Sequence, residues 1–137
     1  MRRILVSFLT FAAALPAFAA APRQMLSTYS AEAARERRGF SPSGERDRQF
    51  YLEKRSAAEK MPNCATCHIE DPTAAGKHVI AGKAIEPIAP VADSARFTDA
   101  AKTEKWFRRN CKEVVGRECT AAEKADLLRY LLAKAGA

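Results

Sequence analysis

The sequence Cys64-Ala65-Thr66-Cys67-His68 constrains the possible fold more than any other feature of this chain. Two residues separate the cysteines, so one helical turn brings both sulfur atoms to the same side, and an imidazole follows directly. C-x-x-C-H is the attachment motif for a c-type haem. The motif therefore predicts one covalent haem c, with Cys64 and Cys67 as its two thioether links and His68 as an iron ligand.

Three other interpretations of this motif were weighed against haem attachment. A redox-active C-x-x-C pair needs no following histidine and normally opens a helix in a βαβ unit, for which this sequence gives no sign. A zinc site of Cys64, Cys67 and His78 would need a fourth ligand, and the other two cysteines lie more than forty residues away. A Cys64–Cys67 disulfide leaves His68 without a role. Haem attachment accounts for all three residues.

The apolar core predicted from the composition is thin. Without the first 19 of its 137 residues, the chain has 24 large apolar side chains among 118 residues. Each buried one contributes roughly 1.5–3 kcal/mol, while ordering each residue costs about 1–2 kcal/mol of backbone entropy. Small domains of this kind usually add disulfides, a metal or a prosthetic group. The composition excludes a membrane-spanning protein, a coiled coil and a multidomain enzyme.

Residues 1–19 are typical of a cleaved secretory signal peptide. Arg2 and Arg3 precede an apolar run over residues 4–15, and the small residues of Ala17-Phe18-Ala19 suit a cleavage site. The run is too short to span a bilayer, which needs about 20 residues. We therefore expect export to the periplasm, where the cysteines meet an oxidising environment.

The chain is basic, with a formal net charge of +7 that falls to +5 without the signal peptide. Acidic residues are interspersed with the basic ones, and no aromatic-basic reading motif is present, so no nucleic-acid partner is predicted. Cations are concentrated in residues 102–117. They form a solvated helix face, or they steer an acidic partner, or Arg108 or Arg109 pairs with a carboxylate of the cofactor.

Hydrophobic periodicity predicts a small all-α domain. No stretch alternates apolar and polar residues for long enough to indicate a strand, and residues 62–90 hold four of the seven prolines, which favours an irregular segment. The predicted helices are Met25–Arg38, ended by Gly39; one from the N-cap Ser43 to about Ala58; one from the N-cap Thr98 to Asn110; and one opened by a Thr120–Glu123 capping box.

The spacing within these helices also predicts which side chains share a face. Phe50 and Tyr51 are expected to be buried in the second helix. Thr103, Trp106, Phe107 and Asn110 lie at i, i+3, i+4 and i+7 of the third helix. The last helix is expected to bury Leu127, Leu128, Leu131 and Leu132, with Tyr130 flanking them.

The sixth ligand of the iron is left open by the residues alone. His68 is the fifth ligand, with its second ring nitrogen bonded to a backbone carbonyl for which Pro87 and Pro90 are candidates. Electron-transfer cytochromes c usually add a Met or His from the C-terminal side of the motif. No Met follows Met61, which lies too close to Cys64 to reach the opposite haem face. The sixth position is therefore His78, a weaker ligand, or open.

The motifs that follow C-x-x-C-H resemble those of the sphaeroides haem protein family, over about residues 43–132. This family consists of small periplasmic monohaem cytochromes c of the class I fold. The resemblance implies a cytochrome c domain, assigned to residues 43–137, that is wrapped around one haem. The predicted N-terminal helix makes residues 20–42 a helical extension of this domain. The matching runs are Gly82 to Pro90, Arg96 to Asp99, Glu104 to Cys111, Gly116 to Thr120, and Glu123 to Asp126.

The same resemblance implies specific roles for three residues. Asn110 corresponds to the sixth ligand of the family, which leaves the iron on reduction so that oxygen or nitric oxide can bind. Cys111 and Cys119 correspond to its disulfide, which would close a nine-residue loop and contribute roughly 2.5 kcal/mol. Asn110 shares a helix face with Trp106 and Phe107, which are expected to contact the haem, although asparagine is also a common helix C-cap.

Two functions are consistent with these features. One is a haem protein that carries electrons and binds a diatomic gas at a weakly held sixth position. The other is a conventional electron carrier with His78 as a fixed ligand. No general acid or dedicated substrate pocket is apparent, so a dedicated enzyme is not favoured. We expect a monomer whose redox partner is a membrane b-type or dihaem c-type cytochrome.

Overall fold

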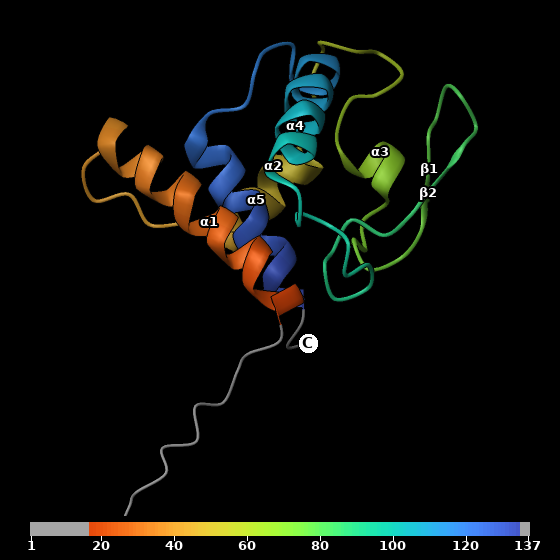
Figure 1. The fold of residues 1–137 in the computed structure, drawn as a ribbon. Coiled ribbons are helices and arrows are strands. Elements are labelled where there is room, and N and C mark those ends of the chain that lie inside the picture. The colour runs from red at the N-terminus through yellow and green to blue at the C-terminus, as the bar shows by residue number, and fades with distance from the viewer. Residues whose placement is uncertain (1–16, 135–137) are drawn as a thin grey trace, which may run out of the picture.

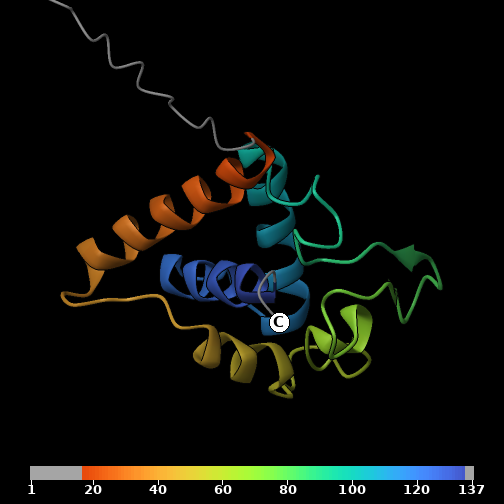
Figure 2. The same cartoon turned by 90° about the horizontal axis from the view of Figure 1, so that it is seen from below.

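Helix α5 (Ala121–Ala133) lies at the centre of the fold in a computed structural model that describes residues 17–134. Helix α1 (Ala17–Glu36) packs along one side of α5, and helix α2 (Gly44–Leu52) packs along the other (Figure 2). Helix α4 (Ala100–Val115), labelled in Figure 1, crosses the end of this layer in the view of Figure 2. The all-α fold class predicted from periodicity is confirmed.

Two hydrophobic clusters hold these helices together. The first joins Tyr29 of α1, Phe107 and Cys111 of α4, and Ala125 and Leu128 of α5. Its aromatic rings meet edge to face, with the centroids of Tyr29 and Phe107 5.8 Å apart. Because three helices contribute to this cluster, α4 is fixed at its crossing position over α5.

The second cluster lies between α2 and α5 and is the one that reaches the haem motif. Tyr51 of α2 is 1% exposed and packs beside Tyr130 and Leu131 of α5 and Ala89 of the connecting loop. Cys64 is partly buried against this cluster. The motif is therefore anchored on the helical core.

Local sequence signals explain where the helices begin. The Ser43 hydroxyl accepts from the backbone N–H of Arg46, as predicted for an N-cap, and the Thr120–Glu123 capping box is present. The prediction for the third helix was wrong by one residue. Thr98 donates its hydroxyl proton to the carbonyl of Ala95 instead, and Asp99 caps α4.

The bounds of α1 and α2 differ from the prediction. Helix α1 begins at Ala17 rather than Met25. Helix α2 ends at Leu52 rather than near Ala58, because side chains satisfy its last carbonyls: Arg55 donates to Phe50 and Asn63 donates to Leu52.

Helix α4 continues through Asn110 to Val115 and ends where Gly116 adopts a left-handed conformation, φ +81°. Asn110 is therefore an interior residue of the helix and not its C-cap. Its side-chain amide is therefore not used to cap the helix.

Burial on α5 also differs from the prediction. Tyr130 is 7% exposed and belongs to the core, because its ring packs beside Tyr51 at a centroid distance of 5.8 Å. Leu128 and Leu131 are fully buried, whereas Leu127 and Leu132 are half-buried. Phe50 of α2 is likewise half-buried.

The segment expected to be irregular contains a short hairpin. Strand β1 (Gly76–Lys77) pairs antiparallel with strand β2 (Ala84–Ile85). Two-residue strands are too short to produce an alternating pattern in the sequence, so the prediction of no strand missed them.

The predicted signal peptide lies mostly outside the described residues, of which only residues 17–19, the start of α1, belong to it. Within residues 17–134, every helix is too short or too polar to cross a membrane.

Candidate haem site

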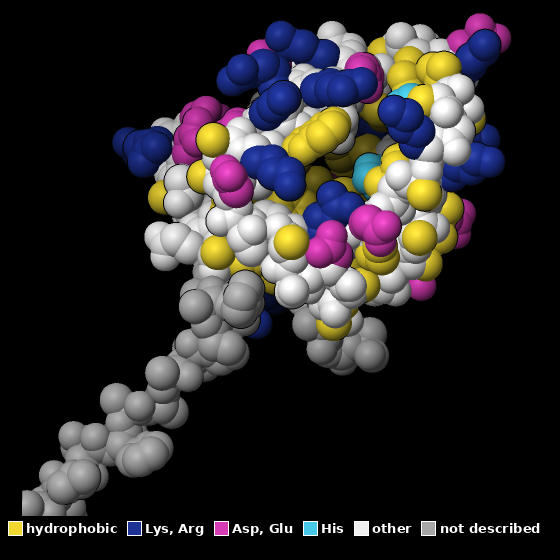
Figure 3. Space-filling model, turned by 45° about the vertical axis from the view of Figure 1, so that its right-hand side comes forward, with side chains coloured by type: hydrophobic (Ala, Val, Ile, Leu, Met, Phe, Trp, Pro, Cys, Tyr) yellow, Lys and Arg dark blue, Asp and Glu magenta, His cyan; other side chains and the backbone are white. Residues whose placement is uncertain are grey.

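A cavity of about 660 Å³ opens between helix α3 (Ala65–His68) and helix α4. Figure 3 shows it as a hollow with hydrophobic side chains inside and charged side chains around its rim. Its size lies within the range of roughly 300–1,000 Å³ that small-molecule and cofactor sites occupy. Cys64, Cys67 and His68 line it, as the attachment motif requires.

The turn that carries the motif is built by Asn63. Its side-chain oxygen accepts from the backbone N–H and the hydroxyl of Thr66, at 2.9 and 2.7 Å. At the other end of α3, Ile69 adopts φ +55°, and the buried Tyr51 hydroxyl donates to its carbonyl at 2.8 Å. Both ends of this short helix are thus fixed to side chains outside it.

The hairpin is pressed directly against this turn. A Cβ atom added at Gly76 would lie 2.0 Å from the carbonyl oxygen of Cys67 and 3.0 Å from the Cα of His68. Such contacts are impossible for any residue with a side chain, so only glycine lets β1 lie here. Gly76 therefore positions the whole hairpin beside the motif.

His68 is held in the form that can bind a metal. Burial, chiefly, and the nearby positive charge of Arg96 together lower the pKa of the imidazole to about 4. The ring is therefore neutral at physiological pH, as a ligand must be. Neither Cys64 nor Cys67 forms a disulfide, and burial raises the pKa of the Cys64 thiol to about 11, so this thiol is protonated at neutral pH.

One of the two backbone acceptors predicted for His68, the Pro87 carbonyl, accepts from another residue. Arg96 Nε donates to the Pro87 carbonyl at 2.8 Å, its Nη2 donates to the Glu86 carbonyl at 2.8 Å, and Nε pairs with Asp93 at 3.0 Å. Among the described residues, the His68 imidazole makes no hydrogen bond. Arg96 thus organises the loop that faces His68, a role that no local sequence pattern predicts.

Helix α4 provides the other wall of the cavity. All four residues predicted to share a face, Thr103, Trp106, Phe107 and Asn110, line the cavity. Thr103 and Phe107 are buried, whereas Trp106 is 44% exposed. Asn110 is exposed and makes no side-chain hydrogen bond within residues 17–134. Because Asn110 lies away from the ends of α4, its side-chain amide, unpaired among the described residues, is available to a ligand in the cavity.

The structure distinguishes the two arginines, either of which was expected to pair with a carboxylate of the cofactor. Arg109 lines the cavity, stacks over the Trp106 ring at 5.6 Å and pairs with Glu113 at 3.1 Å, whereas Arg108 does not line it. His78 and Met61 also line the cavity. Met25 does not, because it packs against the first hydrophobic cluster.

The alternatives to haem find no support in the described residues. No three His, Cys, Asp or Glu side chains within residues 17–134 come together in a way that could hold a metal ion, so Cys64, Cys67 and His78 do not form a zinc site. Cys64 and Cys67 are not joined to each other. The apolar hollow, the neutral imidazole and the two adjacent thiols fit a covalently bound haem.

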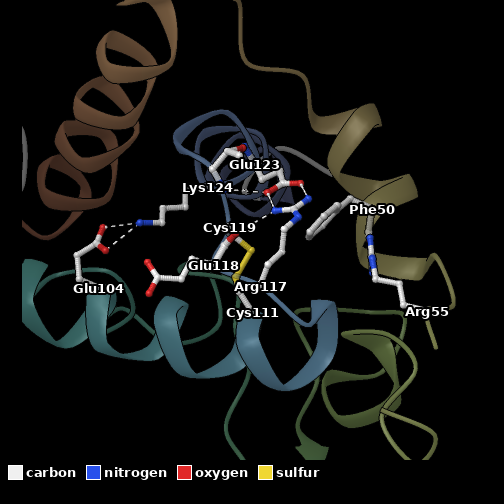
Figure 4. Close-up of a disulfide and its surroundings, with 10 residues drawn as sticks. Phe50, Arg55, Glu104, Cys111, Arg117, Glu118, Cys119, Glu123 and Lys124 are labelled. Carbon is white, nitrogen blue, oxygen red and sulfur yellow. Dashed lines mark hydrogen bonds and ion pairs between the residues drawn. A yellow bond between two sulfur atoms is a disulfide. The ribbon is translucent and has the colours of Figure 1, made fainter. Parts of the chain in front are cut away.

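The predicted disulfide is present between Cys111 and Cys119, with 5.7 Å between their Cα atoms (Figure 4). It ties α4 to the residues that precede α5. Two ion pairs flank it, Lys112 with Glu118 at 3.1 Å and Arg117 with Glu123 at 2.6 Å. Because Cys111 directly follows Asn110, the disulfide fixes the helix at the residue that faces the cavity.

The sequence matches known proteins over most of its length. The family described as "Domain of unknown function (DUF1924)" matches residues 37–131. The cytochrome c-type protein SHP of Cereibacter sphaeroides is 41% identical over 135 residues, which cover 98% of this chain and all of that protein. Cytochrome c'' of Methylophilus methylotrophus is 37% identical over 83 residues, 61% of this chain and 58% of that protein.

Solved structures agree with this relationship. Oxidised SHP, an oxygen-binding cytochrome c, has a TM-score of 0.74 and 44% identity over 82% of this chain and 96% of its own. Oxidised cytochrome c'' has a TM-score of 0.74 and 31% identity over 82% and 94%. The chain therefore belongs to the DUF1924 family together with the sphaeroides haem protein, and it is an all-α monohaem cytochrome c with one covalently bound haem c.

Proposed function

We propose that this cytochrome binds a diatomic gas, oxygen or nitric oxide, at an iron position that Asn110 occupies only weakly and leaves on reduction. The observation that carries the proposal is the Asn110 amide, which lines the cavity from the interior of α4 without a hydrogen-bond partner among the described residues. The relative SHP, described as an oxygen-binding cytochrome c, supports the same assignment.

Three residues of the motif would hold the cofactor. The thiols of Cys64 and Cys67 suit thioether bonds, because both face the cavity and neither forms a disulfide. His68 suits the fifth ligand position, because burial keeps its imidazole neutral. When bound, the haem supplies an iron that changes oxidation state by one electron and accepts axial ligands.

The chemistry of the amide explains why its bond to iron would depend on oxidation state. An amide oxygen is a hard, neutral and weak donor, which suits ferric iron better than ferrous iron. Reduction should therefore release the Asn110 side chain. The Cys111–Cys119 disulfide holds the neighbouring backbone in place, so the released amide can return to the same position.

Replacement of Asn110 by alanine in the holoprotein tests this proposal. We expect the variant to retain haem, to lose the low-spin ferric absorption spectrum, and to bind carbon monoxide in its ferrous form at least as fast as the wild type. His78→Ala is the matched control and should keep the wild-type ferric spectrum. An unchanged ferric spectrum in Asn110→Ala would exclude Asn110 as the ligand.

The alternative function is an electron carrier with a fixed sixth ligand. It is favoured only by His78, the other histidine of the chain, which also lines the cavity. In that case, the ferrous wild-type protein would not bind carbon monoxide, and His78→Ala rather than Asn110→Ala would lose the low-spin ferric spectrum. The pair of variants therefore separates the two functions.

We further propose that the mature protein is a periplasmic monomer that exchanges electrons with a membrane b-type or dihaem c-type cytochrome. The signal-like residues 1–19 and the Cys111–Cys119 disulfide support an oxidising compartment. Fractionation of cells should recover the haem protein in the periplasm with an N-terminus near Ala20. Recovery in the cytoplasm with residues 1–19 intact would contradict this assignment.

A further inference from the structure

The β1–β2 hairpin brings two donor side chains to the rim of the haem cavity. The backbone N–H of His78 donates to the carbonyl of Lys83 at 2.8 Å, and the N–H of Gly82 donates back to His78 at 2.7 Å. His78 and Lys83 therefore lie opposite each other across the turn. Both line the haem cavity.

The turn fixes the position of the proton on the His78 ring. Nδ1 of His78 accepts from the backbone N–H of Ala81 at 3.1 Å and of Ile80 at 3.3 Å. A ring nitrogen that accepts a hydrogen bond carries a lone pair and no proton, so the proton of the neutral ring lies on Nε2. The free edge of His78 is therefore a hydrogen-bond donor.

The same tautomer prevents His78 from acting as the sixth ligand. A neutral imidazole that binds iron through Nε2 carries its proton on Nδ1. In His78 that proton would collide with the two backbone N–H groups and break both hydrogen bonds of the turn. The hairpin is thus built to present an N–H group.

Lys83 is the second donor because, within the described part of the chain, it is an unpaired cation of the cavity and lies on the hairpin opposite His78. Arg96 and Arg109 each pair with a carboxylate of the protein, Asp93 and Glu113, at 3.0 and 3.1 Å. Within residues 17–134, Lys83 makes no ion pair. Lys102 is also unpaired there, but it lies on α4, outside the hairpin.

We propose that Nε2–H of His78 and the Nζ ammonium of Lys83 together bind one propionate carboxylate of the haem. A carboxylate offers two oxygens, so it can accept from both donors at once. The hairpin, whose two-residue strands provide little pairing of their own, is then held against the cofactor that it covers. The proposal depends on haem in this cavity but not on Asn110 as the sixth ligand.

Five variants of the holoprotein test this proposal: His78→Ala, His78→Gln, Lys83→Gln, Lys102→Gln and the double variant His78→Ala/Lys83→Gln. We expect His78→Ala and Lys83→Gln to lower the reduction potential, because an uncompensated propionate charge favours ferric iron. Both should shift the resonance Raman band of propionate bending. His78→Gln keeps an N–H donor and should restore part of each shift. The double variant should shift the reduction potential by less than the sum of the two single-variant shifts, since both residues bind the same propionate.

Lys102→Gln is the matched control because it removes one cavity cation outside the hairpin. The proposal is overturned if His78→Ala and Lys83→Gln shift the potential no more than Lys102→Gln does and leave the Raman band unchanged. It is also overturned if His78→Ala abolishes the low-spin ferric spectrum, which would make His78 the iron ligand. Failure of Asn110→Ala to alter the spectrum would count against the proposed function and leave this assignment intact.

Discussion

Asp47 is a buried carboxyl group without a hydrogen-bond partner among the described residues. Its side chain is 1% exposed, and neither carboxylate oxygen accepts a hydrogen bond. Burial, chiefly, and the negative charges of Asp126 and Glu123 raise the pKa of Asp47 to about 8, although the positive charge of Arg55 opposes the shift. The group is therefore largely protonated in the folded protein at neutral pH.

Because Asp47 has different pKa values in the folded and unfolded chains, it makes the folding stability depend on pH. The pKa in the folded state lies above that of the unfolded chain, which is about 3.9. The corresponding stability is therefore complete below about pH 4 and is lost as the pH rises through about 8. Asp47→Asn should remove this loss. Between about pH 5 and about pH 8, the unfolding free energy of the Asp47→Asn holoprotein should therefore rise relative to that of the wild type, by at most about 4 kcal/mol.

Urea unfolding of wild type and Asp47→Asn at these two pH values measures the effect. Asp71→Asn is the control, since Asp71 is exposed and should change the pH dependence little. If Asp47→Asn loses stability with rising pH as steeply as the wild type, the buried carboxyl is not the group responsible.

Residues whose chemistry is local could be predicted from the sequence. The haem motif needs only the five residues 64–68, and the motifs around Asn110, Cys111 and Cys119 identified the family. The orientation of the His78 ring could not be predicted, because it depends on the turn at Ala81, whose backbone N–H donates to Nδ1. Asp47 was equally unpredictable, because α5 buries it only when α2 is docked.

At the level of elements, the helix starts marked by a side-chain N-cap were more predictable than the start of α1 or the helix ends. An N-cap is a short local interaction, as at Ser43 and Thr120. The end of α2 depends instead on Asn63, which lies eleven residues beyond the carbonyl that it satisfies. The end of α4 at Gly116 was missed because Asn110 resembles a C-cap in sequence.

The connection between α4 and α5 carries the next prediction. The double variant Cys111→Ala/Cys119→Ala should lose roughly 2.5 kcal/mol of unfolding free energy, because the unfolded chain is no longer constrained. If Asn110 is the ligand, the variant should also show a smaller low-spin fraction in the ferric state, since the backbone beside Asn110 is less firmly held. Chemical unfolding and ferric absorption spectra measure the two effects.

Lys112→Gln provides the control for this double variant. It removes the exposed ion pair with Glu118 beside the disulfide but leaves both sulfur atoms in place. Exposed pairs contribute only about 0–1 kcal/mol, so the control should resemble the wild type. A double variant as stable as Lys112→Gln would mean that packing alone holds α4 against α5.

At the scale of the whole molecule, the core is divided between helix packing and the cofactor. The two hydrophobic clusters hold α1, α2, α4 and α5 around one another, but the segment over residues 53–99 has only short elements of its own. That segment and α4 face each other across the cavity of about 660 Å³. Without haem, Trp106 and the neighbouring apolar lining would face water, so the haem acts as part of the core.

Haem removal therefore tests the account of the whole fold. The double variant Cys64→Ala/Cys67→Ala cannot attach haem covalently, and we expect it to lose most helical circular dichroism and to melt without a cooperative transition. The reason is that 24 large apolar side chains among 118 residues leave little net stability once the central apolar group is missing. The Cys111→Ala/Cys119→Ala holoprotein is the control, because it also lacks two cysteines but should still melt cooperatively. A compact, cooperatively melting haem-free form would contradict this account and assign the stability to the α1, α2 and α5 layer alone.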